Sequence, residues 1–170
     1  MRWNERVYIR DLPQKIGETH TIRGWVQFTR KSGKIRFLGI RDGSSIMQGV
    51  LVQGETEEES YQLFKELRQE SSIEVTGVVQ ESKQSQYKVE LLIKTVKILG
   101  TSDQFPITPK EHGIDFLLTN RHLWLRSKKQ VALFQVRNTI IKAIRDFLFE
   151  HQFVQMDSPI LTKSVGEDPD

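Results

Sequence analysis

The alternation of apolar and polar residues across residues 21–52 predicts three consecutive β-strands. Residues 21–30 and 34–41 are rich in β-branched and aromatic side chains, and a Ser-Gly-Lys turn separates the two runs. Residues 42–45, Asp-Gly-Ser-Ser, then form a glycine-containing hairpin connection to a third strand at residues 46–52. We therefore expect the first part of the chain to be organised around this sheet.

The next 50 residues add a predicted helix and two more strands. Thr56 and Glu59 have the spacing of a capping box, and an apolar stripe follows them, so a helix of about a dozen residues is expected within residues 55–70. Residues 73–79 and 87–99 are predicted strands. Five strands with a helix between the third and fourth is the order of an OB-fold, a Greek-key barrel that often binds oligonucleotides. The predicted class is mostly β, with this domain at residues 1–100.

The pattern changes after residue 100. Two prolines exclude a regular helix at residues 105–109, so residues 101–126 are predicted to be a linker or hinge. Ser127, with Gln130 three residues later, begins a long helix that ends at residues 151–152. Its apolar residues occupy more than one face, so a sheet or a partner subunit is expected to cover it.

The last residues add one predicted strand, at 153–156, which Asp157-Ser158-Pro159 ends. The stretch 127–170 is too short for an independent domain. We therefore expect it to be the truncated start of a larger domain.

Composition narrows the class of protein. Hydrophobic residues make up 37% of the chain and charged residues 28%, which is typical of a soluble globular protein. No apolar run approaches the length of a bilayer, and the N-terminus lacks the apolar core of a signal peptide. The absence of cysteine excludes disulfides and thiolate metal sites and favours a cytoplasmic location. His112 and His122 lie near no other metal ligands and are predicted to be structural.

The charge is distributed unevenly. Residues 1–50 contain ten Lys or Arg and four Asp or Glu, whereas residues 51–70 contain two Lys or Arg and six Asp or Glu. Cations neutralise phosphates and aromatic faces stack on unpaired bases, so the predicted sheet indicates binding of a single-stranded nucleic acid. A solvated basic face explains the charge alone equally well. The residues concerned are Arg30, Lys31, Lys34, Arg36 and Arg41, among Trp25, Phe28 and Phe37.

Four sequence blocks resemble the N-terminal part of bacterial asparaginyl-tRNA synthetases, class II enzymes of the aspartate/asparagine/lysine subgroup. They are GWVQFTRKSGKIRFLGIRDGSSIMQGV, QESSIEVTGVVQ, FPITPKEHGIDFLLTNRHLWLRS and VRNTIIKAIRDFLFEHQFVQMDSPILT. Within the third block, PITPKEHG and RHLWLRS resemble the asparaginyl branch. The fourth resembles motif 1, the start of the α+β catalytic domain, which forms the dimer interface in the family and here includes Phe153 and Pro159.

The resemblance implies that the barrel binds the tRNA anticodon. It assigns base stacking to Phe37, hydrogen bonding of the central uridine to Gln48, and contact with the anticodon stem-loop to Arg30. Glu81 matches an acidic residue near the first anticodon base. From the residues alone, strand parity leaves the direction of Phe37 open and a core phenylalanine is favoured. On the same basis, Trp25 is predicted to be a core or packing residue and not a stacking one, Gln48 to be an exposed strand residue, and Arg30 to be a cation beside a turn.

For the intact family member, the resemblance implies a ligase of protein biosynthesis that uses ATP and magnesium to form asparaginyl-tRNA as a homodimer. The arginines of motifs 2 and 3 that bind ATP are expected beyond Asp170. This chain is therefore expected to bind tRNA without a catalytic residue or a bound cofactor of its own. Glu167 matches a glutamate of the amino-acid loop, although Asp168 replaces the glycine that follows it in the family.

Two alternatives stay open at this point. The first is a free-standing OB-fold that binds single strands, with residues 101–170 used for self-association. The second is a fragment that only dimerises.

Overall fold

The computed structural model describes residues 6–82, 88–108 and 110–161. The chain divides into two compact units, Met1–Thr108 and Pro109–Asp170. Residues 101–108, which the sequence places in the linker, are therefore grouped with the first unit.

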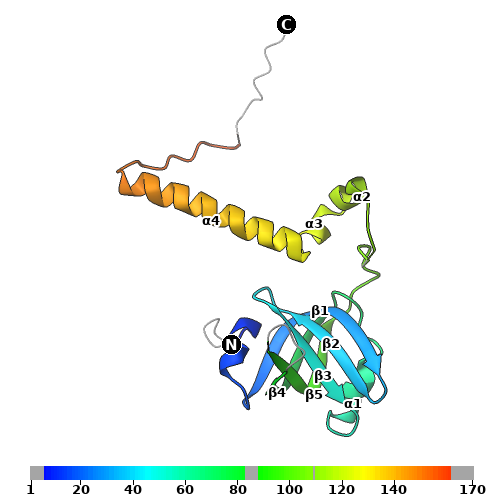
Figure 1. The fold of residues 1–170 in the computed structure, drawn as a ribbon. Helices are drawn as coiled ribbons and strands as arrows, with labels where there is room; N and C mark the ends of the chain where they lie inside the picture. The colour runs from blue at the N-terminus through cyan, green and yellow to red at the C-terminus, as the bar shows by residue number, and fades with distance from the viewer. Residues whose placement is uncertain (1–5, 83–87, 109, 162–170) are drawn as a thin grey trace. The chain divides into compact units, whose positions relative to one another are not determined.

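The first unit is a five-stranded barrel. Its strands are β1 (Thr19–Ser32), β2 (Ile35–Arg41), β3 (Ile46–Val52), β4 (Ser72–Glu81) and β5 (Val89–Gly100). The order around the barrel is β1-β2-β3-β5-β4, and β4 pairs with β1 to close it (Figure 1). The β3–β5 pair is parallel and the other four pairs are antiparallel. This is the OB-fold that the order of elements predicts.

The barrel core is filled by alternate residues of each strand. Ile22, Val26, Leu38 and Ile40 are fully buried on β1 and β2, whereas Arg23, Trp25 and Phe37 alternate with these inward positions and are exposed or partly covered. The 3-10 helix η2 (Ile9–Gln14) adds Ile9 and Leu12 to this core. The alternation fixes which side chains of the sheet are available to a ligand.

Asp42 organises the turn between β2 and β3. Its Oδ1 accepts hydrogen bonds from the backbone N–H groups of Ser44 and Ser45, at 2.9 and 3.1 Å. Its Oδ2 accepts one from the N–H of Ile9 at 2.7 Å. Gly43 has a positive φ of 89°, which a glycine adopts without strain. One buried carboxylate therefore shapes the turn and attaches η2 to it.

The helix between β3 and β4 is shorter than predicted. Helix α1 covers only Glu58–Leu63, and its N-cap residue is Glu57, not Thr56. The Thr56 hydroxyl instead donates to the carbonyl of Ile93 at 2.8 Å and accepts from the N–H of Val52 at 3.1 Å. The predicted capping box is therefore wrong, because this hydroxyl joins β3 to β5.

Replacing Thr56 with valine is expected to destabilise the barrel by about 1–2 kcal/mol, because the buried carbonyl of Ile93 and the partly buried N–H of Val52 lose a partner while the shape is kept. Tryptophan fluorescence during urea unfolding, in a Trp124→Phe background, restricts the signal to the first unit. Thr19→Val makes the same change at an exposed position and should alter stability by less than about 0.5 kcal/mol. Equal unfolding midpoints for the two variants would contradict the assigned role.

The second unit contains helices α2 (Ile114–Thr119), α3 (Arg121–Trp124) and α4 (Lys128–Glu150). Ser127 is the N-cap of α4 and accepts a hydrogen bond from the N–H of Gln130 at 3.4 Å, as predicted. The C-cap is His151, also as predicted. The strand predicted at residues 153–156 is wrong. Among the described residues this segment pairs with no other strand, and an extended segment becomes a β-strand only through such pairing.

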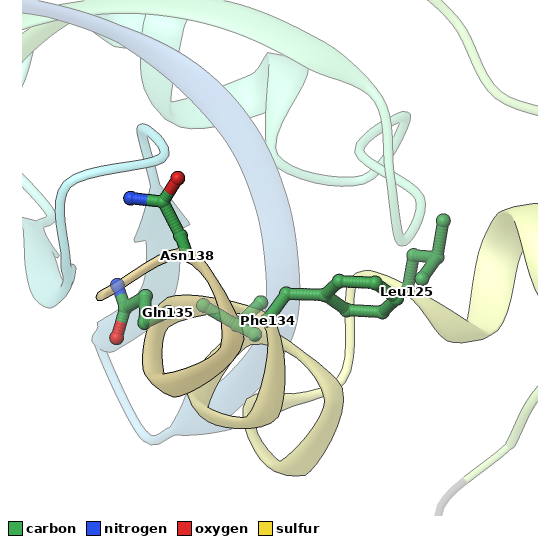
Figure 2. Close-up of a pocket in the computed structure, with 5 residues that line it drawn as sticks. Leu125, Phe134, Gln135 and Asn138 are labelled. Atoms are coloured by element: carbon green, nitrogen blue, oxygen red, sulfur yellow. The ribbon is translucent and has the colours of Figure 1, made fainter. Parts of the chain in front are cut away.

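Helix α4 exposes a large apolar surface. Its exposed side chains include Val136, Ile140, Ile144 and Phe147. A pocket beside the helix is lined by Leu125, Val131, Phe134, Gln135 and Asn138, and Figure 2 shows Phe134 directed towards Leu125. An exposed apolar area of this size is typical of an interaction surface. Within the described part of the chain, no helix is long and apolar enough to span a membrane.

Candidate nucleic-acid interface

The outward side chains of β1, β2 and β3 form two rows. Phe28, Gly39 and Gln48 are register partners in the first row, and Arg30, Phe37 and Val50 are partners in the second. Because Leu38 and Ile40 point into the core, their neighbours Phe37 and Gly39 lie on the opposite side of β2. We call the surface formed by Phe28, Arg30, Phe37 and Gln48 the outer face.

Phe37 is a residue of the outer face and not of the core. It is only partly buried and does not belong to the core cluster, so the prediction of a core phenylalanine is wrong. The guanidinium carbon of Arg30 lies 4.6 Å from the centroid of its ring. A cation at this distance is attracted to the ring face. The structure thus brings together two residues that the sequence nominates separately.

Gln48 extends the outer face towards β5. Its Nε2 donates a hydrogen bond to Oε2 of Glu90 at 3.2 Å, across the parallel β3–β5 pair. Sequence reasoning did not select Glu90. The available signal was its position between the apolar residues Val89 and Leu91, which places a carboxylate on the outward side of a strand.

Glu81 occupies a different position. It is exposed at the end of β4, where it pairs with Val89. Strand alternation places Glu81 on the same side of β4 as the buried Val79. The residue of β4 that pairs with Glu90 is Gln80. The structure therefore does not bring Glu81 to Gln48, and its contact with tRNA stays a prediction.

Two of the five predicted RNA-binding cations belong to the fold instead. Arg36 is 9% exposed, and its guanidinium carbon lies 3.6 Å from the ring centroid of Tyr61. Arg41 forms an ion pair with Glu70 at 2.7 Å. The cations that remain exposed on β1 and in the following turn are Arg30, Lys31 and Lys34.

Trp25 packs on the outer side of β1. Its side chain is 40% exposed and its ring lies 5.5 Å from the Arg41 guanidinium carbon, so of the two predicted roles, core or packing, the structure shows packing outside the core. Its neighbours in β1, Gly24 and Val26, are the buried ones. Strand alternation therefore decides its direction over its size and hydrophobicity.

The described residues contain no group of three or more His, Cys, Asp or Glu that could hold a metal ion. The ring of His112 stacks on Phe116 with centroids 4.7 Å apart. Of the residues nominated for motif 1, Phe153 and Pro159 follow α4, and Phe153 is 62% exposed. Glu167 lies outside the described residues.

Comparison with known families agrees with this geometry. Residues 20–99 match the family described as OB-fold nucleic acid binding domain, and residues 113–169 match tRNA synthetases class II (D, K and N). The chain is 48% identical over 170 residues to the asparagine–tRNA ligase of Streptococcus thermophilus strain CNRZ 1066. The chain belongs to the asparaginyl-tRNA synthetase family. Another asparagine–tRNA ligase, from Streptococcus pneumoniae serotype 4, is 45% identical over 172 residues.

These alignments cover 95% and 96% of the chain but only 38% of each relative, so the chain spans well under half the length of the curated asparaginyl-tRNA synthetases that it matches. Solved structures show the same likeness. The asparaginyl-tRNA synthetase from Pyrococcus horikoshii is 31% identical, with a TM-score of 0.84 over 93% of this chain and 38% of that one. A putative aspartyl-tRNA synthetase from Leishmania major is 26% identical, with a TM-score of 0.80 over 93% of this chain and 35% of that one.

Proposed function

We propose that the barrel binds the anticodon loop of asparagine tRNA on the outer face. The observation that carries this proposal is the position of Phe37, partly exposed beside Arg30 and one row from Gln48. An aromatic face, a cation and an amide are the groups that bind an unpaired nucleotide through its base, phosphate and Watson–Crick edge.

In this proposal Arg30 exchanges its partner when RNA binds. In the free protein its guanidinium lies over the ring of Phe37. An incoming base takes that ring face, and the guanidinium moves to a phosphate, where it forms a charge-assisted hydrogen bond. The ring face is therefore kept covered until a base replaces the cation.

Gln48 and Glu90 select the base. The hydrogen bond to Glu90 fixes the orientation of the Gln48 amide. Its carbonyl oxygen then remains as an acceptor for a ligand, and its second N–H remains as a donor. A uracil edge presents both an N–H donor and carbonyl acceptors, which this amide can match. Glu90, which accepts from Gln48, is a second carboxylate that can accept from a neighbouring base, in addition to Glu81 near the first anticodon base.

For the whole enzyme we propose the family reaction, in which asparagine, ATP and tRNA give asparaginyl-tRNA with the help of magnesium. No step of that reaction is assigned to the described residues. The apolar surface of α4, together with Phe153 and Pro159, is proposed to form a homodimer interface. The expectation that other protein surface covers α4 is part of this proposal.

The test is binding of the full chain to a labelled anticodon stem-loop of asparagine tRNA, measured by fluorescence anisotropy. Phe37→Ala is expected to weaken binding by about 5- to 150-fold, the loss of one stacked base. It should also abolish the preference for the central uridine over cytidine. Phe149→Ala removes an aromatic ring that is 65% exposed on α4 and should leave the affinity unchanged.

If wild type binds every loop equally and Phe37→Ala has no effect, the anticodon proposal is wrong. Strong salt dependence in that case would indicate general single-strand binding through exposed cations.

A further inference from the structure

The ring of Phe28 lies over Gly39. A Cβ atom built on Gly39 would lie 2.9 Å from Cζ of Phe28 and still closer to Cδ1 and Cε1. The ring thus occupies the space that any other side chain at residue 39 would need. Phe28 is nevertheless 44% exposed, so part of the ring remains open to solvent.

A β-bulge directs Phe28 to this position. The β1–β2 register shifts between Val26 and Phe28, so Gln27 is the extra residue of β1. Without the bulge, Gln27 would be the residue opposite Gly39. The bulge leaves Oε1 of Gln27 buried without a hydrogen-bond partner among the described residues. An unsatisfied buried polar atom costs stability, which argues that the position of Phe28 serves a purpose other than folding.

Phe28 stands beside both residues that are proposed to bind the central base. It shares a row with Gln48, across Gly39, and it is the diagonal neighbour of Phe37. Diagonal neighbours on adjacent strands are about 7–8 Å apart, within reach of aromatic side chains. Among the described residues, a cation lies over the ring of Phe37, whereas no ring or cation stacks on Phe28.

We propose that Phe28 is a second stacking platform, which takes the loop base adjacent to the one on Phe37, and that Gly39 is required to make room for it. This inference rests on the proposed anticodon function. Successive unpaired bases stack on successive aromatic rings, and such stacking tolerates any base because every base has a π-face. Phe28 therefore contributes affinity, whereas Gln48 contributes selectivity.

The test is a double-mutant cycle between protein and RNA. Wild type, Phe28→Ala and Phe37→Ala are titrated with the intact stem-loop and with loops that carry one abasic residue, at the central position or at either neighbour. Phe28→Ala should weaken binding of the intact loop by about 5- to 150-fold. That loss should vanish for one neighbouring abasic loop and persist for the central abasic loop. Phe37→Ala should show the reverse pattern.

Gly39→Ala tests the geometry separately. Its Cβ should displace the Phe28 ring and weaken binding to the same degree as Phe28→Ala. In the double variant Phe28→Ala/Gly39→Ala the ring is gone, so the second change should add no further loss. Phe28→Trp keeps an aromatic ring at this position and should therefore bind the stem-loop much more tightly than Phe28→Ala. Melting temperatures of all variants, measured alongside, show that the barrel remains folded.

The outcomes separate this inference from the proposed function. If Phe37→Ala behaves as expected and Phe28→Ala binds like wild type, the second platform is wrong and the anticodon function stands. If Phe28→Ala weakens binding of every abasic loop equally, Phe28 supports the fold and the inference is overturned. If neither substitution affects binding, both proposals fail together.

Discussion

Asp42→Ala is expected to destabilise the barrel by about 3–4 kcal/mol, because a buried carboxylate that accepts several hydrogen bonds is removed. The N–H of Ile9 is the most costly loss, since Ile9 is buried. The Ser44 hydroxyl, which donates to Asp42, also accepts from the N–H of Arg10, so the connection of η2 to the turn loosens at two points.

Urea unfolding followed by tryptophan fluorescence, again in the Trp124→Phe background, measures this loss. Asp42→Asn keeps one acceptor oxygen and should cost about half as much as alanine. Asp103→Ala removes an exposed carboxylate from the same unit and should change stability by less than about 0.5 kcal/mol. If Asp42→Ala were as stable as Asp103→Ala, the hydrogen bonds of Asp42 would not hold the turn.

Arg36→Ala is expected to cost about 3 kcal/mol, because the side chain fills a buried site against aromatic rings. Its guanidinium lies 3.6 Å from the ring centroid of Tyr61 and 5.3 Å from that of Phe64, and it donates to the carbonyl of Tyr61. Among the described residues it forms no ion pair with a carboxylate. Arg36→Met should therefore recover most of the lost stability, since methionine keeps the volume and the aromatic contact.

A matched pair of variants distinguishes the effect on RNA binding of the buried Arg36 from that of the exposed Arg30. Arg36→Met should leave the affinity for the anticodon stem-loop and its salt dependence unchanged. Arg30→Met should weaken binding and lower the slope of log K against log salt by about 0.7, the loss of one phosphate contact with a single strand. Equal effects of the two substitutions on RNA binding would contradict the burial of Arg36.

The sequence predicted the barrel because its strands obey local rules. The alternation and the turn residues placed β2 and β3 almost to the residue. The predicted length of the helix after β3 is too great because threonine is a residue type that favours N-cap positions. The hydroxyl of Thr56 instead makes tertiary hydrogen bonds that no local pattern shows. The strand at residues 153–156 failed for a related reason, since strand formation depends on a partner outside the segment.

The candidate site was predicted less completely than the fold. Parity alone could not say whether Phe37 faces inward, because both alternating sets of β2 contain apolar residues; the burial of Leu38 and Ile40 decides it. The bulge at Gln27 changes the parity of the residues that follow it in β1, and no sequence signal marks it. The sequence alone could not place Glu90 beside Gln48, because that contact depends on the pairing of β3 with β5. Helix α1 and strand β4 separate these two strands along the chain.

The parallel pairing of β3 with β5 also sets the order in which this surface is completed. β1, β2 and β3 are joined by short turns and pair locally, whereas Gln48 meets Glu90 across 42 residues of sequence. Non-local pairs form late in folding, because the loop between them must close first. In a chain that has emerged only as far as β3, the aromatic rings are present without the carboxylate that orders Gln48. Under the proposed function, the selectivity of the outer face is therefore complete only once β5 has paired with β3.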